Sequence, residues 1–416
     1  MSQNKKSYKK IKSCRICKNS NLKTIIDLGK QHIQGAFINK KNKNKIFKKI
    51  PLQLVLCSKC SLVQTKYSVN PDELYKNYWY SSGINFTMRK HLKDLSKEKI
   101  LNFNKKQKIL DIGCNDGTLL NYFSNNYLKV GIDPSDLIKR IKNKKIKIIN
   151  DFFPSKKLLK ITKQKKFDVI TSIAMFYDIE DPCLFVNQIK NILDEKGVWV
   201  FELSYLSDML KLNSFDTICH EHLEYYSLYT LKYLTDNCNM KIFKIKFNDV
   251  NGGSIRCYVT HKQNKKFDNK NNFKIINKFL KKEKDLQISK TKPYRKFNLR
   301  IIKFRQQIKK ILLKLKKLNK IVHIYGASTK GNTIIQWLGI NNKDIAYAAD
   351  RNFKKWGTRT IGTKIQIISE RTSKSMKPQY YLVLPWHFKK EFLKREKKFL
   401  NDGGKMIFPL PTIKIY

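Results

Sequence analysis

The clearest periodicity in the chain lies between about residues 106 and 205, where short apolar runs alternate with segments of helical spacing. These runs read KILDIG, LKVGID, FDVITSIAMF and VWVFELSYL. Short β-rich runs separated by helical patterns are typical of βαβ units, in which crossover helices cover a parallel sheet. The pattern therefore predicts an α/β domain with a parallel sheet in the middle of the chain.

A second α/β pattern begins at residue 321, with the apolar runs IVHIYGAS, DIAYAAD, YYLVLPW and GGKMIFPLP. Before it, residues 206–262 show helices followed by strands. Residues 265–320 are rich in lysine and carry apolar residues at helical spacing. That spacing predicts one long amphipathic connecting helix. A calmodulin-like or membrane-surface role is the alternative for so basic a helix.

Three domains follow from these changes in pattern. We place an N-terminal domain at 1–70, a central α/β domain with a helical entry segment at 71–262, and a connecting helix with a second α/β domain at 263–416. A chain of 416 residues is long enough for two or three domains at roughly 150 residues each.

Composition excludes several classes of protein. Apolar residues make up 41% of the chain and aromatic residues 12%, which excludes wholesale disorder. We find no run of about 18 consecutive apolar residues, so we expect no spanning helix. The basic N-terminus also lacks the apolar core of a secretory signal. We expect a cytoplasmic monomer without a membrane partner.

The formal net charge of +55 would ordinarily indicate a polyanion as partner. Lysine, asparagine, isoleucine, phenylalanine and tyrosine are abundant together, however, and their codons are rich in A and T. The lysines are also spread along the whole chain. We therefore attribute the charge to codon bias and expect no specific nucleic-acid partner, although some of it would help to attract an anionic small substrate.

Four of the nine cysteines form two CxxC pairs, CRIC and CSKC. A CxxC turn brings two thiolates close together, and two such turns can complete a tetrahedral Zn²⁺ site. With all four positions filled by protein, the site would be structural and not catalytic. Two unrelated pairs of buried thiols are the alternative. The predicted ligands are Cys14, Cys17, Cys57 and Cys60.

The segment ILDIGCNDGTLL, residues 109–120, predicts a buried strand, a tight turn and a helix. Glycines in the turn let the backbone approach a ligand, although the G-x-G-x-x-G dinucleotide pattern is absent. An acid at the end of the first strand suits a ligand with a cationic amino-acid part. Asp133, about twenty residues after the turn, could accept hydrogen bonds from two ribose hydroxyls or simply cap a helix.

This series of loop, acid and following strand resembles the S-adenosylmethionine-dependent class I methyltransferase fold. The resemblance implies S-adenosylmethionine as cofactor, with an adenine lying where Asp151 and Phe152 follow the third strand. The expected cofactor-binding residues are Asp111, Gly113, Asn115, Gly117, Asp133, Asp151 and Phe152.

Three titratable residues, His220, Glu221 and His222, form one tripeptide in FDTICHEHLEYYSL, residues 215–228. Such a cluster is unremarkable on a surface, and two histidines at this spacing can also bind a metal. The aromatic flanks and the position after a cofactor domain instead favour a base that works near neutral pH.

Together with NGGSIRCYV (251–259) and YGASTKGNT (325–333), this segment resembles the sugar-nucleotide C-methyltransferase family over nearly the whole chain. The resemblance implies a small N-terminal zinc-binding domain, a central Rossmann-like methyltransferase domain and a C-terminal Rossmann-like domain. It also implies the deoxysugar-biosynthetic activity of that family, which is methylation of a ring carbon of a nucleotide-linked 4-keto deoxysugar.

The family pattern at the catalytic segment is Tyr-His-Glu-His. Carried over to this chain, it makes His222 the general base, Glu221 a supporting residue and His220 the histidine between them. Cys219 stands where the tyrosine is usual, and a thiol cannot replace a phenol. Upstream, YWYSSGINFTMRKH resembles a tyrosine-containing stretch of the family, so Tyr78 or, preferably, Tyr80 would supply a phenol to the site.

The turn after IVHIYGAS carries a helix N-terminus suited to an anion. It lacks Walker spacing and is not a P-loop. The resemblance implies that this domain holds the nucleotide of the substrate, whereas the simpler interpretation is that its glycines only allow close helix–strand packing. We expect His387 to be structural. The expected substrate-binding residues are Ser328, Lys330, Asn332 and Arg351.

Two other functions compete with C-methylation of a sugar. A methyltransferase acting on another enolisable small molecule stays open because of Cys219. A zinc-knuckle nucleic-acid-binding protein is suggested by the charge and the CxxC pairs. It would require the basic residues to gather on one face and binding to be steeply salt-dependent.

Overall fold

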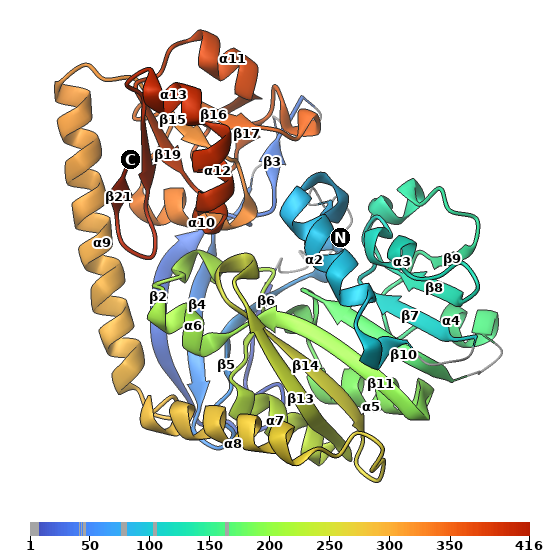
Figure 1. The fold of residues 1–416 in the computed structure, drawn as a ribbon. Coiled ribbons are helices and arrows are strands. Elements are labelled where there is room, and N and C mark those ends of the chain that lie inside the picture. Colours follow the sequence, from blue (N-terminus) through green and yellow to red (C-terminus); the bar gives the residue numbers. More distant parts are fainter. Residues whose placement is uncertain are drawn as a thin grey trace, which may run out of the picture.

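The computed structural model describes residues 8–40, 42, 44, 47–75, 81–102, 106–162 and 166–416. It contains three larger sheets, which we call the N-terminal, central and C-terminal sheets, and a small pair of strands, β1 (Tyr8–Lys10) with β6 (Tyr67–Val69). Figure 1 shows the central sheet at the right and the C-terminal sheet above and to the left of it.

The central sheet has the order β13-β14-β11-β10-β7-β8-β9. The strands from β11 to β9 are parallel, β14 runs antiparallel to its neighbours β11 and β13, and β13 therefore has the same direction as the parallel strands. This confirms the parallel sheet and crossover helices that the alternating pattern predicts. The strands are β7 (Lys108–Ile112), β8 (Leu128–Ile132), β9 (Ile146–Ile149), β10 (Phe167–Ile173), β11 (Leu193–Ser204), β13 (Met240–Asn248) and β14 (Ser254–His261).

The central strands are buried because their apolar runs are covered on both faces. Leu110, Ile170 and Phe201, for example, have no exposed surface. The helices of this region are α2 (Phe86–Ser96), α3 (Thr118–Tyr122), α4 (Lys156–Thr162), α5 (Pro182–Ile192), α6 (Leu206–Lys211) and α7 (Leu228–Asn237). Its short 3₁₀ helices are η1 (Ser82–Ile84), η2 (Lys99–Leu101), η3 (Asp136–Arg140), η4 (Phe176–Asp178), η5 (Phe215–Thr217) and η6 (Val250–Gly252).

The C-terminal sheet is the second α/β unit that the sequence predicts. It has the order β21-β20-β19-β15-β16-β18-β17-β3, with a parallel core from β20 to β18. Its strands from this half of the chain are β15 (Val322–Tyr325), β16 (Tyr347–Asp350), β17 (Arg359–Thr360), β18 (Gln366–Ser369), β19 (Tyr380–Val383), β20 (Lys405–Phe408) and β21 (Lys414–Ile415). Its helices are α10 (Thr329–Leu338), η7 (Phe353–Lys355), α11 (Glu370–Ser375), η8 (Trp386–Phe388), α12 (Lys389–Arg395) and α13 (Lys397–Asn401).

The N-terminal part of the chain is joined to both other parts by strand pairing. Its sheet has the order β12-β5-β4-β2, formed by β2 (Leu22–Gln31), β4 (Ile50–Cys57), β5 (Val63–Thr65) and, from much later in the chain, β12 (Glu224–Tyr225). In return, β3 (Phe37–Ile38) pairs with β17 and becomes an edge strand of the C-terminal sheet. The helix α1 (Pro71–Tyr75) follows this region.

The lysine-rich segment forms two helices and not the single one that its periodicity predicts. They are α8 (Lys270–Asp285) and the long α9 (Lys292–Lys317), which runs along the left side in Figure 1. Gln287, between them, has a φ of 54°, and Pro293 lies at the start of α9. A left-handed residue ends a helix, and proline is tolerated only in the first turn of the next one. Among the described residues, we find no helix with the length and apolarity needed to cross a membrane.

Candidate active site

A cavity of about 650 Å³ lies between the central and C-terminal sheets. One wall is formed by the carboxyl ends of β7, β8 and β10, and the facing wall by the start of α10 and the segment around Trp386–Phe388. Ligands of open α/β sheets bind outside the carboxyl ends of the strands. The motif that we expect to bind the cofactor lies on the first wall, and the motif that we expect to bind the substrate lies on the second.

The turn after β7 forms part of the cavity wall and packs closely against Met175. Gly113 has a φ of 73°, and a Cβ atom there would lie 2.8 Å from Cγ of Met175, so glycine is required. At the end of β7, Asp111 is buried and accepts a hydrogen bond from the Thr171 hydroxyl at 2.6 Å. Burial, opposed by that hydrogen bond and aided by the charge of Asp133, raises the pKa of Asp111 to about 7. Such a carboxyl is ready to receive a cationic group.

Asp133 joins the turns that follow β7 and β8. Its carboxylate accepts hydrogen bonds from the amide of Asn115 at 2.9 Å and from the amide and hydroxyl of Ser135 at 2.8 and 2.5 Å. A carboxylate offers about four acceptor positions, so room for a ligand hydroxyl remains. The side chain that caps the helix η3 is that of Ser135.

The segment after β9 places an aromatic ring at the cavity. Phe152 lines it and is 38% exposed, while Asp151 accepts hydrogen bonds from the Phe152 amide and the Ser155 hydroxyl. Gly117 caps the start of α3 with a φ of 73° and packs against Ile141. It does not line the cavity. An exposed aromatic ring, two carboxylates and a glycine cradle together fit an adenosyl group that carries an amino acid.

His222 lies on the cavity wall with its imidazole held in a defined orientation. Its Nδ1 lies 2.8 Å from the Thr217 carbonyl, so it must carry the proton, which leaves Nε2 as an acceptor. The ring also packs against Tyr177, with ring centroids 4.3 Å apart. Burial and the nearby Lys330 lower the pKa of His222 to about 3. The imidazole is therefore neutral at neutral pH, as a base must be before it accepts a proton.

Glu221 also lines the cavity and is fixed from two sides. Its Oε1 accepts the Gly35 amide at 2.7 Å, and its main-chain carbonyl accepts the Tyr75 hydroxyl at 3.0 Å. Burial raises the pKa of Glu221, and the thiol of Cys219 beside it acts in the opposite direction. Cys219 is fully buried next to Glu221 and is not part of the cavity wall.

The structure places His220 behind the wall. Its Nδ1 contacts the side-chain oxygen of Gln34 at 2.8 Å, and its Nε2 lies 3.3 Å from the Ile50 carbonyl. Both nitrogens therefore face the N-terminal part of the chain, and burial lowers the pKa of His220 to about 4. Together with the pairing of β12 to β5 and a 2.8 Å bond from the Thr65 amide to the Leu223 carbonyl, these contacts attach the whole segment to the N-terminal sheet.

Lys330, on the wall formed by the C-terminal part of the chain, places a positively charged amine near His222. Its amine donates to the Asn251 carbonyl at 2.8 Å, and burial lowers its pKa. Asp216, also nearby, accepts the Trp386 indole at 2.9 Å, and burial raises its pKa in spite of the lysine. Three motifs that are far apart in the sequence thus meet at one point.

The other predicted substrate-binding residues have different surroundings. Ser328 lines the cavity and caps α10 through the Gly331 amide, and Arg351 lines it while pairing with Glu370 at 3.6 Å. Asn332 is buried away from the cavity, where it donates to the Gln34 carbonyl at 2.6 Å. His387, expected to be structural, lines the cavity, and its Nδ1 is buried without a partner among the described residues.

Tyr78 and Tyr80 lie outside the described residues. Tyr75, at the end of α1 in the same tyrosine-rich stretch, lines the cavity and contacts Glu221. Sequence reasoning also missed Asp178, whose carboxyl lies in the cavity wall within η4. Its signal was weak, because the acidic run YDIEDP after β10 resembles a solvated loop.

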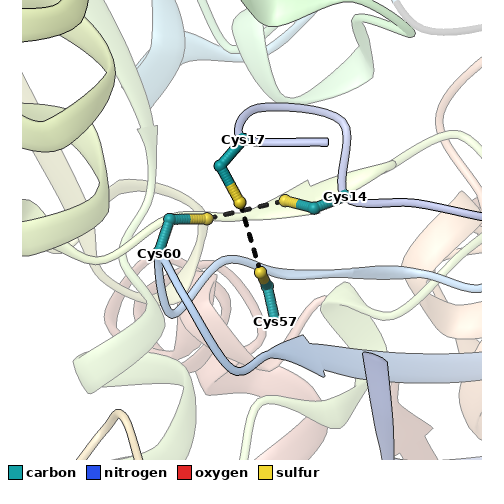
Figure 2. A group of neighbouring side chains, drawn as sticks. All are labelled: Cys14, Cys17, Cys57 and Cys60. Carbon is teal, nitrogen blue, oxygen red and sulfur yellow. Dashed lines mark hydrogen bonds between the residues drawn. The ribbon is translucent and has the colours of Figure 1, made fainter. Parts of the chain in front are cut away.

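The four cysteines of the CxxC pairs converge as predicted (Figure 2). Their sulfur atoms lie within 4.8 Å of one another, with 3.5 Å between Cys14 and Cys60 and between Cys17 and Cys57. Interaction with Cys60 lowers the pKa of Cys14 to about 5, which favours a thiolate. Four sulfur ligands at these separations fit a tetrahedral Zn²⁺ ion.

Arg15, between two of these cysteines, links the cluster to the segment that carries His222. Its guanidinium donates to the Thr65 carbonyl at 2.9 Å and to the Ser68 hydroxyl at 2.7 Å. Its Nε lies 3.5 Å from Glu224, a buried carboxylate two residues after His222. The cysteine cluster and the cavity wall are therefore parts of one packed unit.

Comparisons with known proteins agree with this organisation. Residues 14–75 match a model for a zinc binding domain, residues 86–244 a model for a methyltransferase domain, and residues 249–411 a model for a C-methyltransferase C-terminal domain. The chain is 27% identical to the C-methyltransferase NovU of Streptomyces niveus over 97% of each protein.

Two solved structures are among those similar to part of the chain. An S-adenosylmethionine-dependent methyltransferase from Clostridium acetobutylicum is 15% identical, with a TM-score of 0.34, over 42% of this chain and 92% of its own. The plantazolicin methyltransferase BpumL, solved in complex with a pentazolic desmethylPZN analogue and SAH, is 18% identical, with a TM-score of 0.33, over 43% of this chain and 87% of its own.

The three matched domains occur in the order that the sequence predicts, and the cysteine cluster and cavity lie within them. The zinc site and the S-adenosylmethionine dependence expected from the sequence are thereby confirmed. The chain is an S-adenosylmethionine-dependent methyltransferase in which a zinc-binding domain, a methyltransferase domain and a C-methyltransferase C-terminal domain follow one another.

Proposed function

We propose that this enzyme methylates a ring carbon, C3, of a nucleotide-linked 4-keto deoxysugar, with His222 as the general base. The observation that carries the proposal is the position of this imidazole. Its Nδ1 is bound to the Thr217 carbonyl, and the ring lies in the wall of a cavity that also reaches the carboxyl edge of the central sheet.

The carboxyl edge of the central sheet supports binding of the cofactor. We assign Asp111 to the cationic amino-acid part, Asp133 to the ribose and Phe152 to the adenine. Gly113 keeps the turn open, and Asn115 holds Asp133 through its amide. When bound here, S-adenosylmethionine supplies an electrophilic methyl group.

The opposite wall supports binding of an anionic substrate. Lys330 and Arg351 bring positive charge to the cavity, and Ser328 caps a helix whose N-terminus points there. A diphosphate at these groups would position the attached sugar ring between Lys330 and His222. Asn332 would act indirectly, since it holds Gln34 in place.

The chemistry then follows from the acidity of a carbon next to a ketone. Nε2 of His222 removes the proton from C3, and the electrons of that C–H bond form an enolate with its charge on the C4 oxygen. Glu221 and His220 position the segment through Gly35, Gln34 and Ile50. We also propose that the enzyme acts in deoxysugar biosynthesis and works as a monomer, since one described chain supplies both walls of the cavity and no second chain is needed to complete it.

Product analysis tests the proposal. The purified enzyme is incubated with S-adenosylmethionine and a panel of nucleotide-linked 4-keto deoxysugars, with enolisable ketones that lack a nucleotide as controls. Mass spectrometry should show a gain of one methyl group, and NMR should place it on C3. Methylation of the simple ketones alone would favour the alternative acceptor that the buried Cys219 left open.

A further inference from the structure

Asp178 is a carboxyl group of the cavity wall to which the proposed mechanism gives no role. It ends η4, directly after Tyr177, whose ring packs on His222 at 4.3 Å between centroids. Main-chain bonds hold this segment to its neighbours. The Asp178 amide donates to the Met175 carbonyl at 3.0 Å, and the Tyr177 carbonyl accepts the Leu223 amide at 2.8 Å. Asp178 and His222 are therefore held on one rigid unit.

The surroundings of Asp178 oppose a negative charge on it. Its Oδ1 is buried and has no hydrogen-bond partner among the residues that the structure describes. The phenol of Tyr75 hydrogen-bonds to the carboxyl and also lies 3.0 Å from the Glu221 carbonyl, so two acceptors share its single proton. That phenol oxygen can still accept a hydrogen bond from a protonated carboxyl.

We propose that Asp178 is a catalytic residue that remains a neutral carboxylic acid and donates a hydrogen bond to the C4 oxygen of the substrate as the enolate forms. This inference rests on the proposed function and adds the donor that Cys219 cannot supply from its buried position. A preorganised donor at a developing oxyanion stabilises the transition state, and a carboxylic acid in an apolar site can fill that role.

The titratable groups around Asp178 are consistent with a neutral form. Burial and the acidic side chains of Glu221 and Glu224 hold its pKa well above the usual range, and Tyr75 acts in the opposite direction. Cys219 and Tyr225 also face it from the segment that carries His222. Donation by Asp178 is thus available below its own pKa and is lost as the pH rises through that value.

The proposed step balances without a further reactant. His222 gains the C3 proton and becomes an imidazolium, and the C4 oxygen gains the negative charge together with the hydrogen bond from Asp178. When C3 then forms its bond to the methyl carbon, the carbon–sulfur bond breaks and its electrons remain on sulfur. The C4 carbonyl reforms, Asp178 keeps its proton, and His222 releases the extra proton to water.

The Asn and Ala variants of Asp178 distinguish a hydrogen-bond donor at this position from a base. Asp178→Asn keeps an N–H donor of similar size, whereas Asp178→Ala removes it. We expect Asp178→Ala to lower kcat on the order of 10²–10³-fold, as loss of one oxyanion donor does, and Asp178→Asn to stay within about 10-fold of the unaltered enzyme. The kcat of the unaltered enzyme should fall at high pH, and this decline should be absent in Asp178→Asn. Calorimetry of S-adenosylmethionine binding checks that each variant is folded.

Exchange of the C3 proton with deuterium gives a second readout. We expect exchange to be slowed in Asp178→Ala and retained in Asp178→Asn. Equal losses in the two variants would overturn the inference, because they would indicate an ionised carboxylate, and so would an unchanged kcat in both. Absence of any product with the unaltered enzyme would instead overturn the proposed function, and the inference would fall with it.

Discussion

At the scale of single residues, the cavity combines groups whose protonation states differ from those they have in water. His222 is neutral because burial opposes its charged form, and Asp111 is close to half-protonated at neutral pH for the same reason. Burial lowers the pKa of the base and raises the pKa of the acid, so a charged ligand that enters the cavity can change the protonation state of either group. Such pairs of shifted groups are frequent in active sites.

Replacing His222 tests its role as base. We expect His222→Ala, and the similarly sized His222→Gln, to lower kcat by about 10²–10⁴-fold, which is the usual contribution of a general base. Cofactor affinity should be nearly unchanged, because the residues we assign to the cofactor lie on the other wall. Steady-state kinetics and calorimetry measure the two quantities. A variant that lost cofactor binding would show that we have misplaced the base.

The pKa of Asp111 predicts how cofactor affinity depends on pH. Below about 7 the carboxyl is protonated and attracts no cation, and above that value it is ionised. Affinity for S-adenosylmethionine should therefore increase as the pH rises from about 6 to about 8, by at most tenfold per unit. Calorimetry at several pH values measures this. In Asp111→Asn the affinity should be lower and nearly independent of pH, and an equally steep dependence in that variant would exclude Asp111 as its origin.

At the scale of elements, Glu224–Tyr225 is a strand of the N-terminal sheet although it comes from the middle of the chain. It follows His222 after one residue, so the register of β12 on β5 determines where the imidazole lies. The pairs Glu224↔Gln64 and Tyr225↔Val63 set that register. Contacts of Gly35 and Gln34 with the same segment fix it from a second loop of the N-terminal part.

A side chain at position 35 should disturb this arrangement. A Cβ atom there would collide with Oε1 of Glu221, so Gly35→Ala should displace the carboxylate and lower kcat on the order of 10²-fold. Combined with Glu221→Asp, whose shorter side chain relieves the collision, the substitution should add little to the effect of Glu221→Asp alone. Fully additive losses in kcat would contradict a contact between the two positions.

The sequence predicted the elements better than it predicted their partners. The alternating runs indicated both parallel sheets, since each run can be recognised locally, and the CxxC spacing indicated the four sulfur ligands. The crossed strands β3 and β12 could not be foreseen, because two-residue strands leave no periodicity. Asp178 and Tyr75 were missed for a related reason: their role depends on burial by distant segments, and burial is absent from local sequence.

At the scale of the whole molecule, Zn²⁺ should influence turnover without touching the substrate. We expect one tightly bound Zn²⁺ per chain, absent from Cys57→Ser and Cys60→Ser and retained in Cys183→Ser, whose thiol lies outside the cluster. Metal analysis after dialysis measures this. Protein without zinc should lose kcat and thermal stability while the central sheet still binds the cofactor. Full turnover by the zinc-free protein would contradict the link through Arg15 and Glu224.

The pairing of β12 with the N-terminal sheet has a consequence for any attempt to divide or recombine this enzyme. A fragment that begins after residue 75 would contain the histidine yet lack the surface against which the histidine is aligned. Chimeras between relatives should therefore exchange the first 75 residues together with the segment around His222, as an inseparable cassette. In relatives with this architecture, residues among the first 75 and residues around His222 should therefore change together during evolution, although they lie far apart in the sequence.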